Sequence, residues 1–185
     1  MTKIVHLLSG GLDSVTMLYW LKSLGLIVQC LLFDYKQRHV QELLFARGHC
    51  RKLGVLWQAM ELPALNGLTE DNWVVPNRNA VMLSIAVNVA VQGGYDTVTI
   101  GCNQDDAAMF QDCTPAFIEA MNGAVKAAGY SVRIEAPYIT KQKWEIVRLA
   151  KKFSVPMNEI WTCYRGGSKP CGECPACKKL AEALA

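Results

Sequence analysis

The stretch Ile4-Val5-His6-Leu7-Leu8-Ser9-Gly10-Gly11-Leu12-Asp13-Ser14 decides the fold of this chain. Its first five residues read as a buried strand, and apolar residues recur at helical spacing after it, at Val15, Leu18, Leu21 and Leu24. Two glycines allow the backbone to approach an anion, and the unpaired N–H groups of a first helical turn point outward. The pattern therefore predicts a phosphate-binding loop, to which Ser9 and Ser14 add hydroxyl donors. Asp13 is placed to hold the loop or a Mg²⁺ ion.

Two commoner phosphate-binding loops are excluded. The chain contains no G-x-x-x-x-G-K-[ST] motif, and no G-x-G-x-x-G follows the first strand. The order S-G-G-x-D-S after a first strand resembles the PP-loop of the ATP pyrophosphatases. That family cleaves ATP between its α and β phosphates and transfers AMP to a substrate oxygen. The alternative for this stretch is an ordinary turn with a capping serine.

Composition points to one cytoplasmic domain. The 185 residues are 51% apolar and carry a formal net charge of +3, too small to indicate a nucleic-acid partner. The apolar run at residues 80–91 is too short to span a membrane, and no signal peptide is recognisable at the amino terminus. Eight cysteines in a cytoplasmic protein favour metal or redox chemistry over disulfides.

Strand and helix patterns alternate along the chain. Further strands are expected at residues 27–33, 56–62, 97–100 and 132–136, and further helices at residues 40–53, 80–91, 115–128 and 141–153. This alternation predicts an α/β fold with a doubly wound parallel sheet. The resemblance to the PP-loop proteins implies that this sheet is Rossmann-like and of the adenine nucleotide alpha hydrolase type. Because ligands bind at the carboxyl ends of such strands, the loops at residues 9–14, 34–39 and 101–112 are the expected site.

Four cysteines near the carboxyl terminus form the pattern C-x7-C-x2-C-x2-C, at Cys163, Cys171, Cys174 and Cys177. Four thiolates can complete a tetrahedral zinc shell, which leaves no open position and so predicts a structural ion. An iron–sulfur cluster and the sulfur chemistry of a thiolation enzyme are the alternatives. We expect residues 1–160 to form the PP-loop ATP-binding domain and residues 161–185 a zinc-binding tail packed on it.

Taken together, the motifs resemble those of the 7-cyano-7-deazaguanine synthases over nearly the whole chain. After the PP-loop come Asp34-Tyr35-Lys36-Gln37-Arg38-His39, Pro76-Asn77-Arg78-Asn79, Gly101-x-Asn103 with Asp106, Asp112-Cys113, and Thr162-Cys163-Tyr164 with the cysteine tail. These enzymes use ammonia and ATP to convert 7-carboxy-7-deazaguanine into the nitrile. The carboxylate and then the amide oxygen are adenylated, and AMP and pyrophosphate are released.

The resemblance implies a role for each motif. Ser9, Gly10, Gly11, Asp13 and Ser14 are expected to bind the phosphates of ATP with Mg²⁺, and Asp34 to contribute to the ATP site. Catalytic roles fall to Asp13, Ser14, Arg38 and Lys141, with Lys141 or Lys143 meeting the leaving pyrophosphate. Arg78, Asn79, Asp106 and Asp112 are expected to contact the acid. Alternatives for these residues are a solvated turn at Arg38, surface positions at Lys141 and Lys143, a helix cap at Arg78, and a position before a helix at Asp112.

The chain departs from the family pattern in the loop at residues 107–114 and in a shortened segment between Leu62 and Val75. The family usually has an aromatic-Ser-Gly-Tyr-Pro stretch before its Asp-Cys, where this chain reads Ala107-Ala108-Met109-Phe110-Gln111. Four functions therefore stay open: the nitrile synthase, a variant that stops at the amide, another PP-loop amide ligase or thiolation enzyme, and a binding module without catalysis. The expected partners are the small acid and ammonia, without direct nucleic-acid or membrane contact, and a homodimer is possible.

Overall fold

The computed structural model describes residues 2–65 and 74–185, so most of the segment between Leu62 and Val75 lies outside the described residues. Five parallel strands form one sheet in the order β3-β2-β1-β4-β5. The strands are β1 (Lys3–Leu7), β2 (Ile27–Asp34), β3 (Leu56–Glu61), β4 (Thr97–Thr99) and β5 (Arg133–Glu135). In register, Val5 of β1 pairs with Gln29 of β2 on one side and with Val98 of β4 on the other.

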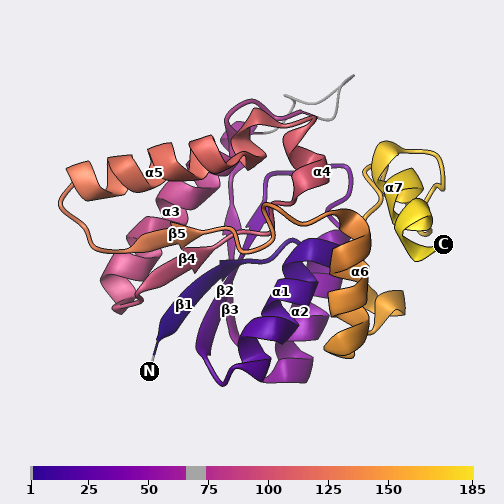
Figure 1. The fold of residues 1–185 in the computed structure, drawn as a ribbon, viewed down its shortest axis with the longest axis horizontal. Helices are drawn as coiled ribbons and strands as arrows, with labels where there is room; N and C mark the ends of the chain where they lie inside the picture. The colour runs from indigo at the N-terminus through magenta and orange to yellow at the C-terminus, as the bar shows by residue number, and fades with distance from the viewer. Residues whose placement is uncertain (1, 66–73) are drawn as a thin grey trace.

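Helices cover both faces of the sheet (Figure 1). The longer ones are α1 (Leu12–Ser23), α2 (Glu42–Leu53), α3 (Arg78–Gly93), α5 (Pro115–Ala127), α6 (Lys143–Lys152) and α7 (Pro175–Leu184). A short helix, α4 (Gln104–Ala107), and the 3₁₀ turns η1 (Pro63–Leu65), η2 (Gln111–Cys113) and η3 (Met157–Glu159) complete the described elements. The predicted doubly wound α/β fold is confirmed.

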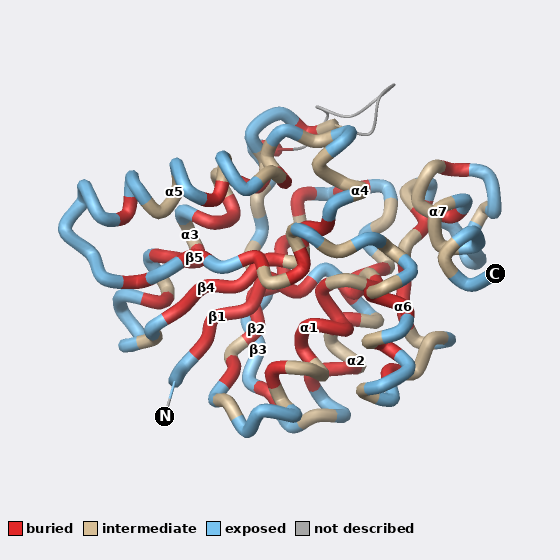
Figure 2. Tube along the Cα trace, viewed as in Figure 1, coloured by how far each residue is buried: buried red, intermediate tan, exposed pale blue. Residues whose placement is uncertain are grey.

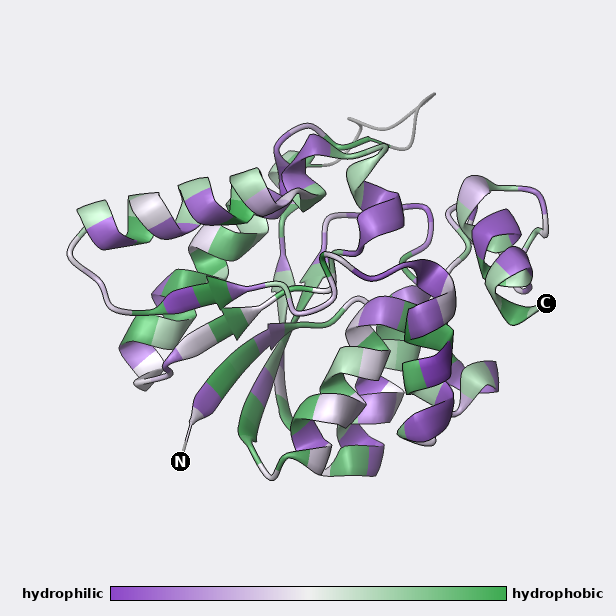
Figure 3. Ribbon diagram, in the orientation of Figure 1, coloured by the Kyte–Doolittle hydropathy of each residue, from purple (hydrophilic) through white to green (hydrophobic). Residues whose placement is uncertain are grey.

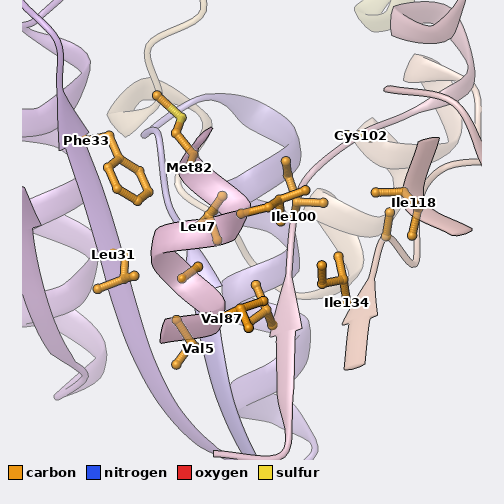
Figure 4. Packing of buried hydrophobic residues seen from close by; sticks show 14 of the residues in the cluster. Val5, Leu7, Leu31, Phe33, Met82, Val87, Ile100, Cys102, Ile118 and Ile134 are labelled. Carbon is orange, nitrogen blue, oxygen red and sulfur yellow. The ribbon is translucent and has the colours of Figure 1, made fainter. Parts of the chain in front are cut away.

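Each face of the sheet has its own hydrophobic core. Val5, Leu31 and Ile134 face α3 and α5, where Met82, Val87 and Ile118 pack on them (Figure 4). On the other face, α1, α2 and α6 meet over Ile4, Val28 and Leu32. Helix α1 packs on the sheet and also against α2 and α6, so much of its length is buried (Figure 2). Burial on several sides holds the amino-terminal end of α1 in a fixed place.

The predicted element bounds agree with the structure to within two residues. Gly54 ends α2 with a φ of 61°, and Thr114 caps α5 by accepting a hydrogen bond from the Phe117 N–H at 3.3 Å, both as expected. Two helices were not predicted. α4 is a single turn, and α7 starts at Pro175 inside the cysteine pattern, for which no helix was expected. Proline at a first helical position was the available signal for α7.

The strand order brings the candidate loops to one edge of the sheet. β1 lies between β2 and β4, so the segments that follow these three strands meet at their carboxyl ends. The hydrophilic helix α4 stands over the same edge (Figure 3). None of the helices in the described part of the chain has the length and apolar character needed to cross a bilayer.

Gly10 is the tightest point of this edge. Its φ is 93°, and a Cβ atom there would lie 2.2 Å from the carbonyl oxygen of Glu42 at the start of α2. The Gly10 carbonyl accepts a hydrogen bond from the Trp161 N–H at 2.9 Å. The loop after β1 is therefore held from behind by α2 and by the carboxyl-terminal segment.

We predict that Gly10→Ala destabilises the protein more than Gly25→Ala. Gly25 also has a positive φ, 72°, but a Cβ there meets nothing within 4 Å, so only backbone strain of about 1 kcal/mol is expected. At Gly10 the clash is with backbone, and the total loss should reach about 3 kcal/mol. Urea unfolding of both variants measures the difference. Equal losses of unfolding free energy in the two variants would contradict the prediction and show that α2 moves aside without an energetic cost.

Candidate active site

A cavity of about 250 Å³ opens at the carboxyl edge of the sheet. A single water needs only about 10–15 Å³ of such space, so this is a ligand-sized hollow and not a packing defect. Its walls come from the loops after β1, β2 and β4, the first turns of α1, α3 and α6, and the carboxyl-terminal tail. The predicted site residues that line it are Ser9, Gly11, Asp13, Ser14, Arg38, Arg78, Asn79 and Asp106.

The loop after β1 is stabilised by its own serines. Ser14 Oγ donates to the Gly11 carbonyl at 3.2 Å and accepts from the Ser9 N–H at 3.2 Å. Ser9 Oγ accepts from the Gly11 N–H at 3.2 Å and lies 3.0 Å from Ser14 Oγ. Gly11 is the N-cap of α1 and has no side chain to cap the helix, and the first-turn residues Leu12, Asp13 and Ser14 line the cavity. The N–H groups of a first helical turn lack partners within the helix and favour an anion.

A buried histidine supports the same turn. His6 is fully buried, with Nε2 at 2.9 Å from the Ser14 carbonyl and Nδ1 at 2.8 Å from Thr99 Oγ1. Because a carbonyl only accepts, Nε2 carries the proton and Nδ1 accepts from the threonine hydroxyl. Burial lowers the pKa of His6 to about 4, against two hydrogen bonds that raise it. A neutral histidine thus links β1, β4 and α1 from within the predicted buried strand.

An ion pair crosses the cavity from α1 to α6. Lys143 Nζ lies 2.7 Å from Asp13 Oδ2, with both side chains less than one fifth exposed. Burial opposes the charge of Lys143, but Asp13 and Asp106 outweigh it and raise its pKa above the ordinary value. Burial also raises the pKa of Asp106, to about 6, although Lys143 opposes that shift. The buried Asp13 Oδ1 has no hydrogen-bond partner among the described residues.

Arg78 supplies the positive charge on the α3 side. Its guanidinium stacks 5.9 Å from the Tyr35 ring centre and donates to the Tyr35 hydroxyl at 3.1 Å. Burial acts to lower the pKa of Arg78, but Tyr35, Asp112 and Glu42 together raise it, so the group stays charged. The alternative of a helix cap at Arg78 is wrong, because Asn77 is the N-cap of α3 and Arg78 is its first residue. The Arg78 side chain lines the cavity.

Four predicted site residues lie outside the lining of this cavity in the part of the chain that is described. Gly10 supports the loop from behind, and Asp34 accepts from the Lys36 N–H at 2.9 Å. Lys141 is more than one third exposed and lies 3.9 Å from Glu145 in the next helical turn. Asp112 accepts from the Asn79 N–H at 3.2 Å, at the start of α3. Their proposed contacts with ligands therefore stay predictions.

Sequence reasoning missed several cavity residues. Tyr35, Gln37 and Glu42 lie on the β2 side, and Trp161 and Tyr164 belong to the tail. Tyr35 and Gln37 belong to the motif at residues 34–39, in which only the charged residues Asp34 and Arg38 were assigned roles in the site. Glu42 stands in the first turn of a helix that leaves the carboxyl edge of the sheet, a position that could have marked it.

The four cysteines of the tail come together as predicted. Their sulfur atoms all lie within 4.8 Å of one another, and all eight cysteines of the chain are free thiols. The Cys171 N–H faces Cys163 Sγ at 3.4 Å, and the Cys174 N–H faces Cys171 Sγ at 3.3 Å. Hydrogen bonds from the backbone of Cys174 and Glu173 lower the pKa of Cys171 to about 6. The arrangement is suited to hold a metal ion.

The tail also closes the cavity. Trp161 stacks on Phe45 of α2 with ring centres 5.7 Å apart, and its indole N–H donates to the Cys163 carbonyl at 2.9 Å. A Cβ on Gly166 would lie 2.2 Å from the Arg38 carbonyl, so the tail backbone rests directly on the loop after β2. Lys179 Nζ donates to the Asp105 carbonyl at 3.0 Å. The cysteine cluster therefore fixes a wall of the cavity.

Solved structures with the same fold are distant in sequence. A 4-thiouridine synthetase–RNA complex with bound ATP matches 99% of this chain and 50% of its own, with a TM-score of 0.61 at 17% identity. An NH3-dependent NAD synthetase from Campylobacter jejuni matches 85% of this chain and 66% of its own, with a TM-score of 0.56 at 20% identity. A U34-tRNA thiolase from Methanococcus maripaludis with its [4Fe-4S] cluster matches 98% of this chain and 63% of its own, with a TM-score of 0.55 at 15% identity.

Similarity to named relatives is much higher. The 7-cyano-7-deazaguanine synthase 1 of Colwellia psychrerythraea is 39% identical over 98% of this chain and 93% of its own. The 7-cyano-7-deazaguanine synthase of Caldicellulosiruptor bescii is 35% identical over 98% of this chain and 92% of its own. The family model described as queuosine biosynthesis protein QueC matches residues 3–185. This chain, whose cavity joins a PP-loop to a four-cysteine tail, belongs to the QueC family of 7-cyano-7-deazaguanine synthases.

Proposed function

We propose that this enzyme converts 7-carboxy-7-deazaguanine, ammonia and ATP into 7-cyano-7-deazaguanine, AMP and pyrophosphate. The observation that carries the proposal is the meeting of three features in one cavity. These are the first turn of α1, the pair of Asp13 with Lys143, and the guanidinium of Arg78. The first two suit a polyphosphate, and the third suits a carboxylate.

The phosphates would lie at the first turn of α1. Its N–H groups and the hydroxyls of Ser9 and Ser14 would bind phosphate oxygens, with Lys143 beside the pyrophosphate that leaves. A carboxylate oxygen held by Arg78 then attacks the α phosphorus in line with that leaving group. The site would accelerate this step by orienting the two reactants and by neutralising phosphate charge away from water. Adenylation is needed because a carboxylate oxygen is otherwise a poor leaving group.

Magnesium fits one atom of this site. The buried Asp13 Oδ1 lacks a partner among the described residues, and a carboxylate oxygen is a ligand that Mg²⁺ prefers. When bound there, the ion would neutralise part of the phosphate charge. Lys143 holds the other oxygen of the same carboxylate at 2.7 Å and so fixes its direction.

Asp106 would recognise the guanine-like ring of the substrate. With a pKa of about 6, this carboxyl is mostly ionised at pH 7 and accepts hydrogen bonds from the N–H edge of a guanine-like ring. After adenylation, ammonia displaces AMP to give the amide. The amide oxygen then attacks a second ATP, and loss of AMP together with the remaining N–H protons leaves the nitrile.

The tail is proposed to hold zinc. Zn–S bonds of about 2.3 Å place tetrahedral ligands about 3.8 Å apart, which agrees with sulfur atoms that all lie within 4.8 Å. An iron–sulfur cluster needs room for several ions between its thiolates and would spread them further. A complete thiolate shell takes no part in the reaction and stabilises the cavity wall formed by Trp161 and Tyr164.

Product analysis tests the proposed reaction. The protein incubated with the acid, ammonia, Mg²⁺ and ATP should release AMP and yield the nitrile by mass spectrometry, and Asp13→Asn should lose at least about 100-fold in rate. An amide as the final product would indicate a shortened reaction, for which the altered loop at residues 107–114 is the candidate cause. ATP binding without AMP release would contradict the proposal.

Lys143→Met should reduce kcat by about 100-fold, because a charge-assisted contact with the departing pyrophosphate is lost. Lys141→Met is the matched control, since that ammonium is exposed and pairs only with Glu145 at 3.9 Å in the described structure. We expect less than a twofold change for the control. Steady-state kinetics on both folded variants measure the two losses of kcat. A larger loss in Lys141→Met than in Lys143→Met would instead assign the contact with pyrophosphate to Lys141.

Metal analysis should find about one zinc per chain. Cys174→Ser should release the ion and lower activity strongly, because the tail no longer holds its wall of the cavity. Cys30→Ala is the control, a fully buried thiol outside the cluster, and it should keep the zinc. Iron and inorganic sulfide in the purified protein, or zinc retained by Cys174→Ser, would contradict the assignment.

A further inference from the structure

A group of polar side chains lines the β2 side of the cavity and has no role in the steps above. Glu42 is its centre, in the first turn of α2, with a side chain only 11% exposed. Gln37 and His39 approach it from the loop after β2, and Tyr35 and Arg78 lie next to them. A buried carboxyl group that faces a reaction cavity is a candidate for proton transfer.

The Glu42 carboxyl is held in one orientation. Gln37 Nε2 donates to Glu42 Oε1 at 3.1 Å. The same amide also donates to the Phe33 carbonyl at 3.2 Å and accepts from the Tyr35 N–H at 2.9 Å, so its own direction is fixed. His39 Nε2 lies 3.5 Å from Glu42 Oε1. Gln37 and His39 thus orient the carboxyl group, and neither forms the ion pair that a close cation would form with it.

The surroundings set the charge of this carboxyl. Burial raises the pKa of Glu42 to about 8, while the Gln37 hydrogen bond and the charge of Arg78 oppose the shift. Burial, with Arg78, lowers the pKa of His39 to about 4, so His39 is neutral. Tyr35, whose pKa burial raises, is neutral as well. Glu42 is therefore the group of this set that changes charge near neutral pH.

We propose that Glu42 is the general base of the amide-forming step, and that it binds ammonia together with the neutral ring of His39. The inference rests on the proposed function, since it concerns the adenylated acid. The ammonia lone pair forms the C–N bond, and the C–O bond to AMP breaks with the electron pair leaving on AMP. The proton released by the nitrogen passes to the Glu42 carboxylate and later to solvent.

The charges of the cavity separate the two reactants. Arg78 attracts the carboxylate of the acid from α3, and Glu42 and His39 offer acceptors for N–H bonds from the α2 side. A second cation beside Arg78 would be repelled, whereas neutral ammonia is not. Ammonia would then reach the activated carbon already hydrogen-bonded to the group that takes its proton.

Glu42→Gln tests the assignment, because glutamine keeps the shape and hydrogen bonds of the side chain but cannot accept the proton. We expect acid-dependent exchange of labelled pyrophosphate into ATP, which reports adenylation, to stay within about twofold of wild type. Amide formation from ammonia should fall at least about 100-fold. Glu61→Gln is the matched control, an exposed glutamate at the end of β3 that does not line the cavity, and it should change neither rate.

Hydroxylamine in place of ammonia supplies the pH test, since it stays neutral between about pH 7 and 9. Hydroxamate formation by the wild type should rise with pH through about 8, where Glu42 loses its proton, and Glu42→Gln should lack this rise. Unchanged amide formation by the variant, or loss of exchange together with amide formation, would overturn the role of Glu42. Absence of exchange in the wild type would instead overturn the proposed function, and this inference with it.

Discussion

The hydrogen bond from the Trp161 N–H to the Gly10 carbonyl, 2.9 Å long, joins the first loop of the chain to its last segment. Gly10 also lies against the backbone of Glu42, so three separate parts of the sequence meet at one residue. The loop after β1 cannot shift without moving the start of α2 and the tail. This constraint keeps the first turn of α1 open toward the cavity, and every role proposed for the site depends on it.

Around this fixed backbone, the cavity keeps its charges in two groups. Lys143 pairs with Asp13 on the side of α1 and α6, where a polyphosphate and Mg²⁺ would replace this contact, and the charge of Asp106 also acts on Lys143. Arg78 and the ionisable carboxyl group of Glu42 form the second group, toward β2 and α3. Partly buried charges of this kind are costly for folding unless they are paired. Their concentration at the sheet edge, between two apolar cores, is what a site for charged reactants requires.

Much of this arrangement could be predicted from the sequence, because hydrophobic periodicity and the PP-loop pattern are local signals. They were sufficient for the five strands, the parallel sheet and most of the cavity loops. They were not sufficient for choosing between Lys141 and Lys143. Lys141 precedes α6 and Lys143 is its first residue, and only the three-dimensional structure shows that Lys143 is the one that meets Asp13. Helix α7, which begins at Pro175, was missed because this segment was interpreted through its cysteine spacing alone.

The central claim is that a carboxyl oxygen of the substrate attacks the α phosphorus of ATP at the first turn of α1. Oxygen-18 placed in both carboxyl positions of 7-carboxy-7-deazaguanine tests it directly, because the bond to phosphorus transfers that oxygen. The account predicts that each AMP formed carries one labelled oxygen and that pyrophosphate carries none. Label in pyrophosphate, or AMP without label, would contradict it.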